Sequence, residues 1–166
     1  HDTPEAMAVQ REVLPELDAG SWRLLQLDTR VVGEAHGEVG EAQRLELAER
    51  LGRDERPTAI VMHHPPMAVG TAWIDELGLV DGDAFWAIVE RFAQVKLVLC
   101  GHVHQAFHGR YAGENGEIQV FATPSTSDQF LPGSDTFALD EASRPGFRVL
   151  DLSRGGFQSW VERVEV

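Results

Sequence analysis

The chain has 166 residues, 43% of them hydrophobic, and a formal net charge of −13 at pH 7. This length and apolar content suit one globular domain with a core of its own. So acidic a chain is unsuited to binding nucleic acid or an anionic membrane through a basic patch, so we expect neither partner. A phosphorylated small molecule stays compatible with it, because a bound cation can reverse the charge locally.

The first forty residues predict a helix, a strand and a loop. Thr-Pro-Glu at positions 3–5 resembles a helix start, with a hydroxyl cap, a proline in the first turn and an acidic residue after it. We expect this helix to run toward Asp18 and to end near Gly20. Residues 22–27 follow as an apolar strand, and residues 31–40, which contain three glycines, predict a loop.

Two helices then alternate with two strands. Residues 41–53 and 83–92 have apolar side chains at helical spacing, and residues 58–62 and 95–100 are short apolar runs typical of buried strands. The spacing predicts that the buried faces of the helices carry Leu45, Ala48 and Leu51 in the first, and Phe85, Ile88, Val89 and Phe92 in the second.

The last part of the chain contains only strand patterns. These are residues 119–122, 147–152 and 157–164, and the last two are joined at Gly155-Gly156, a pair that favours a hairpin turn. Alternating strands and helices followed by consecutive strands predict a layered α/β fold with an antiparallel extension.

The chain has one cysteine, Cys100, inside the strand pattern 95–100. A single cysteine excludes an intrachain disulfide and a cysteine-based zinc site, and we expect Cys100 to be a small core residue. No apolar run is long enough to span a bilayer, and the first residues do not resemble a signal peptide. We therefore expect a soluble, cytoplasmic protein.

The motif Gly101-His102-Val103-His104 directly follows the strand 95–100. In an extended segment, residues two apart point to the same side, so both imidazoles would reach one spot. We expect Gly101 to remove a Cβ that would block a sharp exit from the strand. Because imidazole is the commonest protein ligand for transition metals, the motif indicates half of a metal site.

A second strand, 58–62, ends in His63-His64-Pro65-Pro66. A right-handed strand–helix–strand crossover brings the carboxyl ends of both strands to one edge of the sheet, where ligands of such sheets bind. We therefore expect His63 to meet His102 and His104, on a turn stiffened by the prolines. The alternative is a loop with one hydrogen-bonded and one exposed imidazole.

Other histidines and other metal motifs have less support. His36 reads as a loop residue that could line a pocket, and His108 as a solvent-facing residue near a turn. The spacing His-Glu-x-x-His is absent, and no Asp-His pair follows His104 as a metallo-β-lactamase site requires. A site of three histidines, as in carbonic anhydrase, stays open.

The order of these motifs resembles the second half of calcineurin-like metallophosphoesterases, whose pattern is Asp-x-His, Gly-Asp, Gly-Asn-His-(Asp/Glu), His and Gly-His-x-His. His1-Asp2, His63 and residues 101–104 match its last three blocks. Nearly the whole chain resembles bacterial class III 3',5'-cyclic-AMP phosphodiesterases of the CpdA type. That resemblance is carried by His36-Gly37-Glu38 with Gln43, His63-His64 with Gly70 and Trp73-Ile74-Asp75, Cys100-Gly101-His102-Val103-His104-Gln105, Ala122-Thr123-Pro124-Ser125-Thr126 with Gln129-Phe130, and Pro145-Gly146-Phe147-Arg148.

The resemblance implies a layered αββα fold, a β-sandwich flanked by helices. Residues 1–166 would form a single domain that is the carboxyl-terminal part of a metallophosphoesterase domain. The implied reaction is hydrolysis of 3',5'-cyclic AMP to 5'-AMP by metal-activated hydroxide at a dinuclear centre. The two ions would be iron or manganese, with zinc as an alternative.

The resemblance also implies roles for individual histidines. His63 and His102 would bind one metal and His104 the other, with His104 also near the substrate. His64 would lie behind the ligands or at the edge of the substrate site. His1 would contact the phosphate and help to protonate the leaving alkoxide, as the catalytic residue.

Three hydroxyl residues, Thr123, Ser125 and Thr126, follow the metal motif in the chain. By the resemblance they line the nucleotide pocket, and by their local pattern they equally fit a capped turn between strands.

The first two blocks of the family pattern, and the asparagine before His1, are not in this sequence. They would supply the bridging carboxylate and most of one metal's ligands. We therefore expect the carboxyl-terminal portion of a longer phosphodiesterase, weakly active or inactive alone, whose unpaired sheet edges favour a homodimer. The alternatives are a phosphodiesterase for other substrates, such as glycerophosphodiesters, and a non-catalytic module of the same fold.

Overall fold

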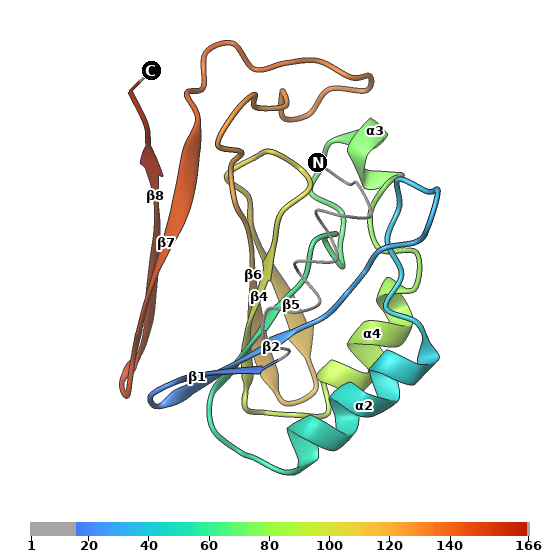
Figure 1. Cartoon of the computed structure of the whole chain (residues 1–166), viewed down its shortest axis with the longest axis vertical. Coiled ribbons are helices and arrows are strands. Elements are labelled where there is room, and N and C mark those ends of the chain that lie inside the picture. The colour runs from blue at the N-terminus through green and yellow to red at the C-terminus, as the bar shows by residue number, and fades with distance from the viewer. Residues whose placement is uncertain (1–15, 166) are drawn as a thin grey trace.

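The computed structural model describes residues 16–165, which form two sheets and three helices (Figure 1). The larger sheet has the strand order β1-β2-β3-β4-β6-β5. Its strands are β1 (Glu16–Ala19), β2 (Trp22–Gln26), β3 (Thr58–Val61), β4 (Val95–Cys100), β5 (His108–Gly113) and β6 (Gly116–Ala122). The helices are α2 (Glu41–Gly52), α3 (Ala72–Asp75) and α4 (Gly82–Val89), and the smaller sheet pairs β7 (Gly146–Ser153) with β8 (Gly156–Arg163).

The centre of the larger sheet is parallel. β2, β3, β4 and β6 run in the same direction, and β1 and β5 pair antiparallel at the two edges. Parallel strands end at the same edge of a sheet, so the segments that follow β3, β4 and β6 meet there. This arrangement decides where the site lies.

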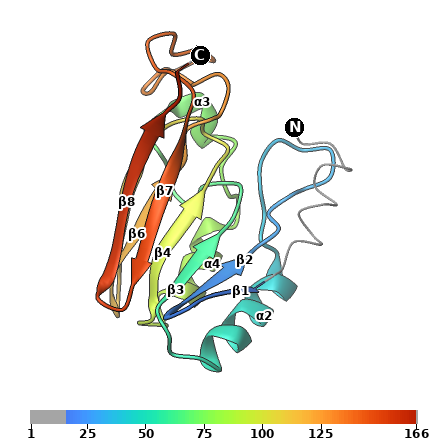
Figure 2. The same cartoon turned by 60° about the vertical axis from the view of Figure 1, so that its left-hand side comes forward.

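The two faces of the larger sheet are covered differently (Figures 1 and 2). α2 and α4 lie on one side of the sheet and the β7–β8 hairpin lies on the other. Alternate residues of each strand point to opposite faces. The helix side buries Leu25, Ile60, Val98 and Val120 against Leu47, Leu51, Phe85 and Val89, and the hairpin side packs Trp22, Ala59, Leu97 and Phe121 with Leu150, Leu152 and Phe157.

The predicted α/β layered fold with an antiparallel extension is confirmed. The two strands that precede the histidines, and the helices expected at residues 41–53 and 83–92, have ends within three residues of the expected ones. The carboxyl-terminal hairpin also forms, but its turn is one residue earlier than the expected Gly155-Gly156: Ser153 pairs with Gly156, so the turn residues are 154–155. Among residues 16–165, no helix has the length and apolar character that a membrane crossing requires.

Two expectations on local structure were wrong. The helix expected to reach Asp18 is replaced over Glu16–Ala19 by β1, which gains backbone hydrogen bonds from β2 through a turn at Gly20 (φ 67°); the rest of that helix lies outside the described residues. Leu45 is 60% exposed, because the face of α2 that meets the sheet runs through Leu47 and Leu51. His108 is exposed, as expected, and it starts a strand, β5, that its polar and glycine-containing sequence does not indicate.

Candidate metal centre

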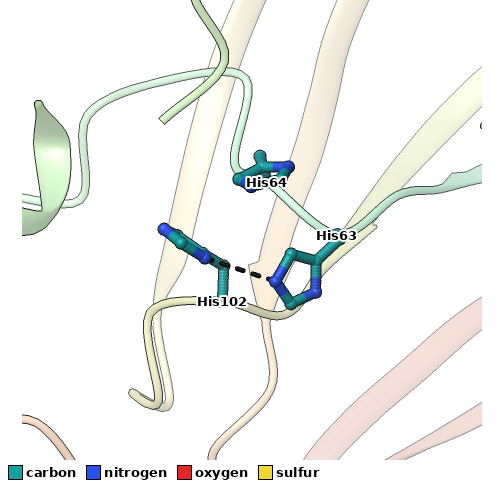
Figure 3. Close-up of side chains that lie close together, drawn as sticks. All are labelled: His63, His64 and His102. Carbon is teal, nitrogen blue, oxygen red and sulfur yellow. Dashed lines mark hydrogen bonds between the residues drawn. The ribbon is translucent and has the colours of Figure 1, made fainter. Parts of the chain in front are cut away.

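Three imidazoles gather at the carboxyl edge of the parallel strands (Figure 3). His63 and His64 follow the end of β3 after one intervening residue, Met62, and His102 follows the end of β4 after one intervening residue, Gly101. The nitrogens with which they could bind a metal all lie within 4.8 Å of one another. Nε2 of His63 is 3.3 Å from Nδ1 of His102, within hydrogen-bond distance. The parallel pairing of β3 with β4 therefore brings together two of the three histidines expected to meet here.

The spacing of these nitrogens fits a shared metal ion. Metal–nitrogen distances of about 2.0–2.1 Å place two imidazole nitrogens on one ion roughly 3–3.5 Å apart. The His63–His102 separation lies in that range. Because the ring planes of His63 cross those of His64 and His102 at 89° and 76°, the rings do not stack face to face. The group that the described residues form contains imidazoles only, so any carboxylate ligand comes from outside it.

His64 is buried and held from a different part of the chain. Its Nδ1 lies 2.8 Å from the hydroxyl oxygen of Thr29, and its backbone N–H donates to the same oxygen. A hydroxyl can accept one hydrogen bond and donate another at the same time. A Cβ at Gly37 would stand 2.3 Å from Nδ1 of His64, so only glycine fits there. Thr29 and Gly37 together determine the orientation of the His64 ring.

The segment that carries His63 and His64 is anchored to the helical layer. The carbonyl oxygen of Pro66 accepts a hydrogen bond of 2.8 Å from Nε1 of Trp86 in α4. The carbonyl oxygen of Pro65 accepts one from the N–H of Leu79. Both prolines are buried, so the turn is rigid for reasons beyond proline's own restricted backbone.

The backbone of the second motif differs from the expected extended form. His102 and His104 have φ values of 66° and 50°, the left-handed region that non-glycine residues rarely occupy. The expected role of Gly101 was also wrong: a Cβ there would meet His63 at 3.6 Å, an ordinary contact. Left-handed residues outside glycine concentrate at functional sites, where surrounding structure holds them. The two histidines consequently do not point to one spot.

His104 lies outside the three-imidazole group. Its Nδ1 is 2.9 Å from the carbonyl oxygen of Asp128, and its ring stacks on Phe130 with 4.2 Å between centroids and 10° between planes. The turn that presents Asp128 is held by the buried side chain of Gln129, whose Nε2 donates to the carbonyls of Ser125 and Ser127. His104 is therefore oriented by the segment after β6.

The hydroxyl residues of that segment have different surroundings. The hydroxyl oxygen of Ser125 accepts a hydrogen bond of 3.0 Å from the backbone N–H of Ser127. Ser125 therefore caps a turn, the alternative to lining the nucleotide pocket. Thr126 is exposed. Thr123 donates to the carbonyl of Pro124 and lines a hollow of about 340 Å³ together with His63. His1 lies outside the described residues.

Two hollows meet at His63. The smaller one lies between the ends of β3 and β4 and the hairpin residues Arg148 and Leu150. The larger, of about 710 Å³, lies between the ends of β2 and β3, the loop that follows β2, and the start of α2, and is lined by Thr29 and His63. The candidate centre is therefore bordered by open space on two sides.

Arg148 joins the hairpin to the larger sheet. Its guanidinium donates to the carbonyls of Ala122 and Phe107 and to the hydroxyl of Ser159, and it sits 4.7 Å from the ring centre of Phe121. Burial holds its pKa below the usual value for arginine. Arg148, Gln129 and Gly37 occur in motifs that carry the family resemblance, whereas nothing in the sequence singles out Thr29.

Comparison with known proteins identifies the class of fold. No family model matches the chain. A solved structure of a dimetal phosphatase from Danio rerio superimposes with a TM-score of 0.57 over 89% of this chain and 59% of its own, at 13% sequence identity. The described residues therefore have the fold of a dimetal phosphatase.

The sequence comparisons are more specific. The chain is 49% identical over 142 residues to the 3',5'-cyclic adenosine monophosphate phosphodiesterase CpdA of Vibrio vulnificus, covering 85% of this chain and 50% of that protein. It is 39% identical to the CpdA of Escherichia coli over 81% of this chain and 48% of that protein, and 34% identical to the CpdA of Pseudomonas aeruginosa over 99% and 61%. The chain is thus a relative of the CpdA-type phosphodiesterases, as its motifs predicted, and it spans about half the length of the curated relatives it matches.

Proposed function

We propose that these residues form the histidine-rich part of the active site of a cyclic nucleotide phosphodiesterase that hydrolyses 3',5'-cyclic AMP to 5'-AMP. The observation that carries the proposal is the gathering of His63, His64 and His102 at the carboxyl edge of the parallel strands. Relatives named as cyclic AMP phosphodiesterases add the reaction class. We further propose that residues 1–166 are the carboxyl-terminal part of one metallophosphoesterase domain.

We infer a centre of two metal ions, iron or manganese, with zinc as an alternative. Such ions, when bound, neutralise the phosphodiester charge and supply hydroxide at neutral pH. His63 and His102 are the proposed ligands of one ion, and their separation of 3.3 Å suits that role. His64, fixed by Thr29, either joins them or supports them from behind.

His104 is the proposed ligand of the second ion. A metal-binding imidazole characteristically donates its other N–H to a carbonyl or carboxylate, which selects the tautomer and holds the ring. The Asp128 carbonyl stands 2.9 Å from Nδ1 of His104, which leaves Nε2 as the nitrogen with a lone pair. The same contact fixes the direction in which that lone pair is presented.

Substrate contacts follow from the surroundings of the centre. We propose His1 as the donor to the departing ribose oxygen, a task that an imidazole can perform at neutral pH. Thr123 is a better candidate for a substrate contact than Ser125, because it lines the hollow beside His63 while the Ser125 hydroxyl caps a turn. We also propose the cytoplasm as the compartment, consistent with the single, unpaired Cys100.

The test compares the 166-residue chain with the longest natural protein that contains it, both loaded with Mn²⁺ or Fe²⁺. Metal content and release of 5'-AMP from cyclic AMP are measured. We expect efficient turnover by the longer protein and little by the 166-residue chain. In the longer protein, we expect His102→Ala to lower metal content and turnover to background. His108→Ala, an exposed histidine on β5, is the matched control and keeps both.

Three results would contradict the proposal. A metal-loaded longer protein that leaves cyclic AMP intact excludes the reaction. Faster hydrolysis of glycerophosphodiesters than of cyclic AMP favours the other phosphodiesterase specificity. Metal binding without hydrolysis of either substrate favours a non-catalytic module.

A further inference from the structure

A cluster of aromatic rings extends outward from His104. The His104 ring stacks on Phe130, and Phe130 meets Phe137 edge-on at 5.5 Å between centroids. Trp73 of α3 packs against both phenylalanines, at 5.1 and 5.3 Å. Phe137 is nevertheless 62% exposed. Much of this large apolar ring is thus exposed to solvent, and the ring of Phe130 separates it from His104.

Hydrogen bonds fix the segments that carry these rings. The hydroxyl of Thr71 accepts the side-chain N–H of Gln105 at 3.1 Å and the backbone N–H of Gly133 at 3.0 Å. Asp75 in α3 accepts three successive backbone N–H groups, those of residues 69–71. Three separate segments are therefore tied together around the cluster. A surface held in this way loses little conformational freedom when a ligand binds.

The neighbouring rings leave Phe137 as the member of the cluster that can stack on a ligand. One face of Phe130 is covered by His104, and its surroundings are occupied by Trp73 and Phe137. Trp73 packs edge-on against both phenylalanines and is partly buried. Phe137 alone combines a fixed position with an open surface, and a flat aromatic ring is a platform for another flat ring.

We propose that Phe137 is the stacking surface for the base of the nucleotide, and so the residue that favours nucleotides over other phosphodiesters. The inference rests on the proposed function, because it requires the phosphate to lie at the histidines. In a nucleotide the sugar separates the base from the phosphate, and in this cluster the ring of Phe130 separates Phe137 from His104. Stacking contributes to binding without selecting among bases, since every base has a π-face. Cyclic AMP and cyclic GMP should therefore bind with similar affinity.

The test uses isothermal titration calorimetry on the metal-loaded longer protein that contains these residues. It compares the binding of 5'-AMP with that of ribose 5-phosphate, which lacks the base. Loss of one base–aromatic stack weakens binding by about tenfold. We expect Phe137→Ala to lower the affinity for 5'-AMP by that factor and to leave ribose 5-phosphate unchanged. Phe137→Tyr should keep the wild-type affinities, and so should Phe147→Ala, which removes an exposed aromatic ring on β7.

The outcomes separate this inference from the proposed function. If Phe137→Ala leaves 5'-AMP binding unchanged, or weakens both ligands equally, the stacking role is excluded. If cyclic AMP is hydrolysed with the same KM by wild type and by Phe137→Ala, stacking is again excluded while the phosphodiesterase proposal stands. If the wild-type protein does not hydrolyse cyclic AMP but prefers 5'-AMP to ribose 5-phosphate through Phe137, the stacking role stands and the reaction fails.

Discussion

The hydroxyl of Thr29 and Nδ1 of His64 lie 2.8 Å apart, although 35 positions separate the two residues. Both side chains are buried, and the same oxygen also accepts the backbone N–H of His64. One threonine therefore satisfies two buried polar groups of the residue next to the proposed ligand His63. This contact makes the loop that follows β2 part of the centre.

Thr29→Val should weaken metal binding while keeping the shape of the side chain. Removing a hydrogen bond that orients a metal-site histidine costs about 10–100-fold in affinity. The same change leaves buried groups without a partner, which should lower the free energy of unfolding by about 1–3 kcal/mol. A competition titration with a metal indicator and a urea unfolding curve measure the two effects. Thr29→Ser keeps the hydroxyl and should resemble wild type; if Thr29→Val does too, the contact has no orienting role.

Gly37→Ala should displace His64 and destabilise the fold. The added Cβ would lie 2.3 Å from Nδ1 and 2.7 Å from Cβ of His64, distances at which one of the two segments must move. Overpacking of this kind costs about 1–3 kcal/mol. Urea unfolding checks the loss, and Gly52→Ala at the end of α2, where a Cβ meets nothing within 4 Å, is the control. Equal stability of both variants would show that the loop containing Gly37 can shift to accommodate a Cβ without a cost in the free energy of unfolding.

Arg148→Met should loosen the β7–β8 hairpin from the larger sheet. The substitution leaves the carbonyls of Ala122 and Phe107 without the donors that the guanidinium now supplies. Hydrogen bonds from a charged group contribute about 1.5–3 kcal/mol, so we expect a loss of that size in the free energy of unfolding. Arg154→Met, in the exposed hairpin turn, should change it little. A loss no larger than that of Arg154→Met would contradict the anchoring role.

Cys100 predicts a pH dependence of stability at alkaline pH. Burial raises the pKa of its thiol to about 12 in the folded protein, whereas an unfolded thiol ionises near about 8.5. The unfolded state therefore loses its proton first, and the free energy of unfolding falls as the pH rises from about 9 to about 12. Cys100→Ala should show a smaller fall over the same range in urea unfolding curves. Parallel pH profiles of the two proteins would contradict this assignment.

Most of the architecture could be predicted from local pattern. The apolar runs that became β3 and β4, and the helical periodicity of α2 and α4, are strong local signals that packing did not overturn. Edge strands were harder, because β1 and β5 have weak strand patterns of their own and form by pairing with the adjacent strands β2 and β6. For Glu16–Ala19, hydrogen bonds from β2 outweighed the local preference for helix.

Local pattern along the chain was enough to predict that two strands end in histidines at one sheet edge and that the motifs resemble those of metallophosphoesterases. The reason is that strand periodicity and motif order are written along the chain. Which imidazoles meet depends on the assembled fold, because the left-handed backbone at His102 and His104 turns one ring toward His63 and the other toward Phe130. The orientation of His64 by Thr29 and Gly37 also depends on it, since contacts between residues distant in sequence form only when the sheet and its loops are assembled.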